Sequence, residues 1–180
     1  FERFVPEAER VARLGTDVRP NEILRLTGDA ERGRQLFLAS AGLQCRNCHR
    51  AQGQGIALGP DFDGLGAKRS REELLESLIE PSKKIDPQYI SYVVETADGH
   101  VHQGLLVERS DQAIVLRTPE NKLVRVAADN VEYFAPQQKS IMPEMLLRDM
   151  TAQQVADLLA YLQSLKQPAD NPSAGQPGTR

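Results

Sequence analysis

Both cysteines of this 180-residue chain lie in one pentapeptide, Cys45-Arg-Asn-Cys-His49, in which a histidine follows the second cysteine directly. Two thiols separated by two residues lie about one helical turn apart, so both can form thioethers with the vinyl groups of a single porphyrin. The next residue then lies under the iron, where its imidazole can serve as an axial ligand. The motif therefore predicts one covalently attached c-type haem, bound through Cys45, Cys48 and His49.

Other interpretations of the motif are a thioredoxin-like redox pair, half of a zinc site, or chance. A redox C-x-x-C is typical of a helix N-terminus within a βαβ pattern, and no strand pattern precedes this one. A structural zinc site usually needs four Cys or His ligands. The rest of the chain offers only two further histidines, His100 and His102. These considerations favour haem.

The composition is that of an ordinary globular domain. Hydrophobic residues make up 40% of the chain, and 22 basic against 25 acidic residues give a net charge of −3. This balance argues against a general binder of nucleic acids or membrane surfaces. No apolar run approaches the roughly 18 residues that a membrane span needs. Because the chain begins at Phe1 without a signal-peptide pattern, we expect a processed protein or an excised domain.

Three helices are predicted around the motif. Residues 1–28 lack strong periodicity, so we expect an N-terminal extension on the surface. Asp29 is a suitable N-cap for a helix through residue 38. Capping boxes begin at Ser70 and at Thr151, and the latter opens a helix to about residue 165. We expect this last helix to pack on the first one through Gly33 and Phe37.

A glycine-rich segment over residues 53–66 follows the motif. It is not a dinucleotide fingerprint, because Leu58 stands where the third glycine would be and no strand leads into it. We expect a tight loop against the haem edge, in which the Pro60 carbonyl accepts a hydrogen bond from His49 and fixes the orientation of the ring. The alternative is a mobile surface loop.

The pattern becomes strand-like between residues 89 and 134. Short β-rich runs alternate with turn signals, the strongest of which is Asp98-Gly99, so four or five antiparallel strands are predicted in a small barrel or rolled sheet. Residues 86–135 carry eight acidic and four basic residues, a balance of −4. Phosphate binding needs the opposite sign, so nucleic acid is not an expected partner.

A second axial ligand is expected from the distal side of the haem. Met142 is the preferred candidate, because a proline follows it and it lies in the loop before the last helix. Met145, His100 and His102 are alternatives, and the site could also stay open. Met150 is expected to pack in the core.

The chain resembles the class I c-type cytochromes. That resemblance rests on Gly33-x-x-x-Phe37, Cys45-x-x-Cys48-His49, Gly59-Pro60, Met142-Pro143 and Asp157-Leu-Leu-Ala-Tyr-Leu162. More narrowly, residues 28–166 resemble the Planctomycete/Verrucomicrobia-type haem-binding domain, through Gly59-Pro-Asp-Phe, Glu80-Pro-Ser-Lys83, the Asp98-Gly99 turn and Ser140-Ile-Met-Pro143. The resemblance implies a haem c with His49 and Met142 as axial ligands and a periplasmic or otherwise extracytoplasmic location. In that family the domain often closes a larger chain that contains a dehydrogenase.

Together these patterns predict a mainly α cytochrome c fold with an inserted small antiparallel β domain, α+β overall. The core is expected over 29–85 and 136–166, the insert over 86–135, and a disordered tail over 167–180. The expected function is single-electron transfer with a dehydrogenase or respiratory partner protein, without residues that act as acid, base or nucleophile. Two alternatives stay open: an open-site haem protein acting as peroxidase or gas sensor, and an interaction module whose β insert docks a dehydrogenase.

Overall fold

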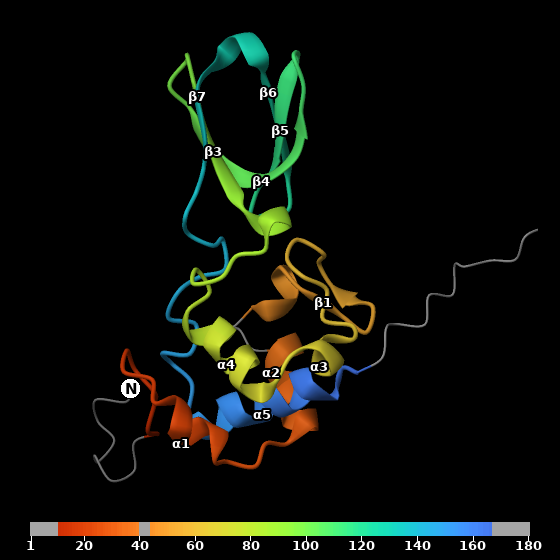
Figure 1. Cartoon of the computed structure of the whole chain (residues 1–180), viewed down its shortest axis with the longest axis vertical. Coiled ribbons are helices and arrows are strands. Elements are labelled where there is room, and N and C mark those ends of the chain that lie inside the picture. The colour runs from red at the N-terminus through yellow and green to blue at the C-terminus, as the bar shows by residue number, and fades with distance from the viewer. Residues whose placement is uncertain (1–10, 40–43, 167–180) are drawn as a thin grey trace, which may run out of the picture.

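The structure is a computed structural model that describes residues 11–39 and 44–166. Helices form one part and a five-stranded antiparallel sheet forms the other, so the fold is α+β (Figure 1). The helical part consists of α1 (Pro20–Leu24), α2 (Ala30–Ala39), the 3-10 turn η3 (Cys45–Asn47), the short strands β1 (Arg50–Ala51) and β2 (Gln54–Gly55), α3 (Leu65–Lys68), α4 (Arg71–Ile79) and α5 (Ala152–Ser164).

Side-chain caps define where these helices begin. Asp29 Oδ1 accepts from the backbone N–H of Arg32 at 2.8 Å, which caps α2. Ser70 and Thr151 each form a complete capping box, with Glu73 and Gln154 respectively. Each box satisfies two backbone donors that the first helical turn would otherwise leave unpaired. The predicted starts of the helices are confirmed.

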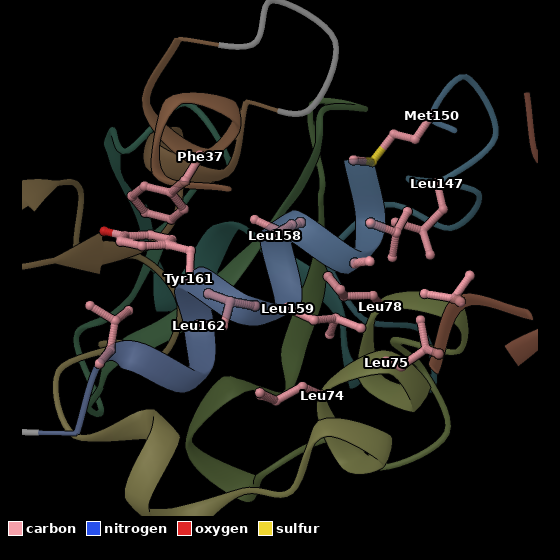
Figure 2. Close-up of a cluster of buried hydrophobic side chains, with 14 of the residues drawn as sticks. Phe37, Leu74, Leu75, Leu78, Leu147, Met150, Leu158, Leu159, Tyr161 and Leu162 are labelled. Atoms are coloured by element: carbon pink, nitrogen blue, oxygen red, sulfur yellow. The ribbon is translucent and has the colours of Figure 1, made fainter. Parts of the chain in front are cut away.

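The main hydrophobic core surrounds α5 (Figure 2). On one side, Tyr161 meets Phe37 of α2, with 5.7 Å between the ring centroids. On the other side lie Leu75 and Leu78 of α4. The two helices α2 and α5 cross very closely at Gly33, where a Cβ atom would lie 2.0 Å from the Asp157 carbonyl oxygen. The predicted pairing of the first and last helices is confirmed.

The segment before α2 belongs to this core. Ile23 of α1 is fully buried against α4 and α5, and the N–H of Leu14 donates to the Met150 carbonyl at 2.8 Å. The expectation of a surface extension is therefore wrong for this segment, because Ile23 lies in the core and Leu14, Val18, Leu24 and Leu26 pack against it. Residues 1–10 and the predicted disordered tail, 167–180, lie outside the described residues.

The sheet follows the predicted strands closely. Its strands are β3 (Ser91–Thr96), β4 (Val101–Arg109), β5 (Ala113–Arg117), β6 (Leu123–Ala127) and β7 (Val131–Pro136), in the order β6-β5-β4-β3-β7. Two further 3-10 turns, η4 (Pro87–Tyr89) and η5 (Ala128–Asn130), precede β3 and β7. Because β6 and β7 are the two edges and do not pair, the sheet is curled rather than closed into a barrel (Figure 1).

The chain enters and leaves the sheet at one place. Strands β3 and β7 are antiparallel neighbours, and Tyr92 near the start of β3 pairs with Pro136 at the end of β7. The sheet has its own small core, in which Val94, Ile114, Leu116 and Val126 are buried. It projects away from the helices (Figure 1). Among the described residues, no helix is long and apolar enough to cross a lipid bilayer.

Candidate haem-binding site

The cysteine motif forms a tight turn directly after α2. The backbone N–H groups of Cys48 and His49 both donate to the Cys45 carbonyl, at 3.1 and 2.9 Å. This turn is η3, and it is entered through Gln44 in the left-handed conformation (φ 48°). The two thiols therefore lie one turn apart, with the imidazole following the second.

The His49 side chain is held in one orientation by the loop that follows it. Only 9% of the residue is exposed, and its Nδ1 lies 2.8 Å from the Pro60 carbonyl oxygen. A carbonyl oxygen can only accept a hydrogen bond, so Nδ1 is the nitrogen that carries the proton. The lone pair of the neutral ring is consequently on Nε2, which is the tautomer that a metal ligand needs.

Gly59 allows the loop to approach the imidazole this closely. A Cβ atom at Gly59 would lie 2.7 Å from His49 Cε1 and 3.0 Å from Nδ1, closer than a side chain can pack. The backbone N–H groups of Leu58 and Gly59 also donate to the Cys48 carbonyl, at 3.0 and 2.7 Å. The glycine-rich loop is therefore folded back onto the motif, and the mobile surface loop is not what the structure contains.

Phe62 covers one face of the His49 ring. Their centroids are 4.3 Å apart and the planes differ by 19°, which is a stacked arrangement. Phe62 also contacts Phe37 of α2, at 5.8 Å between centroids. Sequence reasoning assigned no role to Phe62, although it lies in the Gly59-Pro-Asp-Phe segment that carries the family resemblance. The ring shields the imidazole from water and ties it to the helical core.

Polar contacts join residues 50–52 to residues 61–63, the two segments at the base of this loop. Arg50 Nε donates to Asp61 Oδ2 at 2.7 Å, and the Phe62 N–H donates to the Arg50 carbonyl at 2.8 Å. The N–H of Gln52 donates to Asp63 Oδ1 at 2.6 Å. These contacts hold the residues after Pro60, and the hydrogen bonds of Leu58 and Gly59 to the Cys48 carbonyl hold those before it, so the carbonyl that meets His49 is fixed from both directions.

Burial keeps the motif uncharged. It raises the pKa of the Cys45 thiol to about 11 and also raises the pKa of Cys48, so both remain thiols near neutral pH. Burial lowers the pKa of His49, and the hydrogen bond to Pro60 only partly opposes this shift. A neutral imidazole with a free Nε2 is therefore the dominant form at neutral pH.

The loop that carries Met142 follows β7 and precedes α5 in the sequence. Met142 is half-buried and packs against the helical core, as Cys45 does. Its backbone N–H donates to Ser140 Oγ at 3.1 Å, and the N–H of Ser140 donates to Ser82 Oγ at 3.2 Å. The sequence singled out Met142 but neither serine, although both occur in segments quoted for the family resemblance.

The other candidate ligands lie in different surroundings. Met145 is 61% exposed, and Met150 is 5% exposed within the core, as expected. His100 and His102 lie side by side at the start of β4, with ring centroids 6.2 Å apart. The β3–β4 turn beside them is at the far end of the sheet from the helices (Figure 1). The structure therefore brings together the motif and Pro60, and places both histidines far from them.

The residues present fit a covalently bound haem better than a protein-ligated metal ion. Within residues 11–39 and 44–166, no group of three or more His, Cys, Asp or Glu side chains could hold a metal ion. A haem iron needs from the chain only axial donors, and His49 could supply one through Nε2, held in a cradle that any side chain at Gly59 would fill. Two unpaired thiols complete the set.

Comparison with known proteins agrees with this chemistry. The cytochrome c family profile matches residues 30–113, from α2 through the motif into β5. A curated protein from Synechocystis sp., described as "Cytochrome c-553-like", is 32% identical over 78 residues, which is 43% of this chain and 70% of that protein.

Proposed function

Because the chain belongs to the cytochrome c family, we propose that Cys45 and Cys48 bind its haem c covalently and that His49 and Met142 are the axial ligands. Membership of this family implies that the chain is an electron carrier with a c-type haem and a redox partner. When bound, the haem supplies an iron that accepts and releases one electron. We propose a single haem, since the chain contains one pair of cysteines.

The observation that carries the proposal is the geometry of His49. The Pro60 carbonyl fixes the proton on Nδ1, Gly59 makes room for the ring, and Phe62 excludes water from one of its faces. An imidazole held in this way keeps its ligating nitrogen in place and strengthens it as a donor.

On the distal side of the haem, the surroundings of the candidate ligands support Met142 over its rivals. It packs against the same core as Cys45, whereas Met145 is mostly exposed and Met150 is enclosed in the core. His100 and His102 lie beside the β3–β4 turn, and Figure 1 shows this turn at the end of the sheet that is farther from the helices. A thioether opposite His49 favours the ferrous state and raises the potential relative to two histidines.

We extend the proposal to the organisation of the chain. Residues 29–85 and 136–166 are taken as the cytochrome core and 86–135 as an inserted β domain of the Planctomycete/Verrucomicrobia type. The pairing of Tyr92 with Pro136 supports an insertion, because an inserted domain must begin and end close together in space. The separate core of the sheet supports it as well.

The family resemblance supports the proposed partner and location. We take the partner to be a periplasmic dehydrogenase or a respiratory protein, because such haem is attached outside the cytoplasm in that family. No side chain of the site is assigned as acid, base or nucleophile, since His49 Nδ1 is occupied by a carbonyl and the two thiols would be thioethers.

The visible spectrum of the haem-loaded protein tests the ligands. We expect sharp low-spin bands in the reduced form and, in the ferric form, the weak red band of sulfur bound to iron. Met142→Ala should abolish the sulfur band, whereas the control Met145→Ala should leave it unchanged.

Other outcomes would identify the alternatives. Loss of the sulfur band in Met145→Ala but not in Met142→Ala would reassign the ligand. A low-spin spectrum that never shows this band would point to a histidine. A high-spin spectrum, with carbon monoxide binding to the reduced protein at neutral pH, would favour the open-site peroxidase or gas sensor.

A further inference from the structure

Two serine hydroxyls connect the loop that carries Met142 to the end of α4. Ser140 Oγ accepts from the Met142 N–H at 3.1 Å, and Ser82 Oγ accepts from the Ser140 N–H at 3.2 Å. The Ser82 hydroxyl also donates to Glu144 Oε1 over a longer distance of 3.4 Å. Ser82 thereby joins residues on both sides of Met142 to a single point just beyond α4.

Packing does little to immobilise this part of the loop. A cavity of about 530 Å³ adjoins it, lined in part by Ser82, Glu144 and Met145. Met145 is 61% exposed and adopts a left-handed backbone conformation, with φ at 60°. A side chain beside open space gains few of the contacts that fix a buried one. Met142 itself packs against the helical core, whereas the residues that follow it gain few side-chain contacts, so hydrogen bonds are what hold that side of the loop.

The loop is anchored in the cores of the two parts at its two ends. Ser91, which is fully buried at the start of β3, reaches the Lys139 carbonyl with its hydroxyl at 3.4 Å, and its carbonyl accepts from the Gln137 N–H at 2.8 Å. At the other end, Leu147 is 1% exposed in the helical core. Between these anchors, Ser82 and Ser140 supply the side-chain hydrogen bonds nearest to Met142.

We infer that Ser82 and Ser140 are positioning residues that keep the Met142 sulfur on the iron. The inference rests on the proposed ligation by Met142. Both hydroxyls bond to backbone N–H groups, so they leave the donor strength of the sulfur unchanged and instead limit how often the loop moves away. Removal of one such hydrogen bond should raise the dissociated fraction about fivefold.

Imidazole is a suitable probe, because it can occupy the sixth position of the ferric haem only when Met142 has left. Titration of the haem-loaded protein, followed by loss of the sulfur band, should give about fivefold tighter apparent imidazole binding for Ser82→Ala and for Ser140→Ala. Ser82→Thr retains a hydroxyl and should bind imidazole as the parent does.

The matched control is Ser77→Ala. The Ser77 hydroxyl donates to the Glu73 carbonyl within α4, at 2.9 Å, and among the described residues it has no hydrogen bond to the loop. Its imidazole affinity should equal that of the parent. Far-UV circular dichroism and haem content of every variant establish that the helices and the attachment are intact.

The outcomes distinguish this inference from the proposed ligation of the iron by Met142. If Met142→Ala keeps the sulfur band, both are overturned. If Met142→Ala loses the band while Ser82→Ala and Ser140→Ala bind imidazole no more tightly than Ser77→Ala, the ligation stands and the positioning role is overturned.

Discussion

The helical part and the sheet are held together in different ways. The helical core gathers 15 buried residues from five separated stretches of chain, between Ile23 and Leu165. The sheet core contains four buried residues that all lie within one stretch, from Val94 to Val126. The first core forms only when the ends of the chain meet, whereas the second can form locally. Every residue proposed to bind the haem lies outside the sheet.

Backbones approach closely at glycines in both parts, since a Cβ on Gly104 of β4 would also collide with the Arg117 carbonyl. At the α2–α5 crossing, a Cβ on Gly33 would collide with the Asp157 carbonyl, and one on Gly28 would collide with the Ala156 carbonyl. At the β3–β4 turn, a Cβ on Gly99 would meet nothing within 4 Å. Glycine is needed at Gly33 for space and at Gly99 for its backbone conformation.

Gly33→Ala should produce the largest effect. The added methyl group meets backbone that cannot move aside, so we expect the helical part to lose about 3 kcal/mol of unfolding free energy. Guanidinium titration followed by haem absorption measures this loss. A far-UV signal that isolates the sheet should not shift, and a common shift of both signals would mean that the two parts unfold as one.

Gly99→Ala is the corresponding change in the sheet. Its φ of +84° is unfavourable for a residue with a side chain, although the space around it is open. We expect a cost of about 1 kcal/mol, seen only in the unfolding of the sheet. A shift in the haem-monitored transition would contradict the separation of the two cores.

Asp157→Asn tests the polar contact between α2 and α5. Arg32 donates to both oxygens of the buried Asp157 carboxylate, at 2.7 and 3.0 Å, and lowers its pKa. Loss of the charge should cost about 2 kcal/mol at neutral pH. Because the folded-state pKa lies below the ordinary 3.8, this stabilisation is present above that pH and is lost as the pH falls through the folded-state value.

Unfolding free energies of parent and Asp157→Asn, measured as a function of pH, check this expectation. The two curves should run parallel near neutrality and converge only below about pH 4. Convergence that begins near pH 6 would mean that titration of a histidine, and not of Asp157, produces the pH dependence of the difference. A constant offset at all pH values would mean that the charge of Asp157 is not what stabilises the crossing.

Removal of the sheet should produce the smallest effect on the helical part. Because Tyr92 and Pro136 are direct partners, a two-residue Asn-Gly turn can replace residues 93–135. The haem spectrum should be retained, with a loss of less than about 1 kcal/mol from the helical part. Loss of the haem bands would contradict the insertion.

The same variant tests the sheet as a docking platform. If the sheet is the docking surface, reduction of the electron carrier by its redox partner should slow when residues 93–135 are absent, although the haem spectrum is unchanged. Unchanged partner kinetics would remove the sheet from recognition and leave the helical part as the docking surface.

Features that depend only on residues close together in the sequence were predictable. The capping boxes at Ser70 and Thr151 and the Asp98-Gly99 turn depend on residues within four positions of one another, and all are present. The sheet runs from Ser91 to Pro136, within two residues of the predicted span from 89 to 134 at each end. The contact between His49 and Pro60 spans only 11 positions and follows from the tight loop between them.

Features that depend on distant segments were not predictable in this way. Ile23 looks like part of a weakly patterned extension, and only the assembled core shows that it is buried. Phe62 and Ser82 act through neighbours brought to them by folding, and the signal that their own surroundings offer is the family resemblance of the segments in which they lie. Ligation by Met142 stays a prediction, since it depends on where the loop lies relative to the haem.

The Pro60 carbonyl also determines how protons behave when the site changes charge. A carboxylate in its place could take up the Nδ1 proton of His49, but a backbone carbonyl has no accessible protonation near neutral pH. With Nε2 on the iron, as proposed, the imidazole contains no group that titrates there. Electron uptake is then unaccompanied by a proton on this side of the haem, and the potential should not vary with pH through His49.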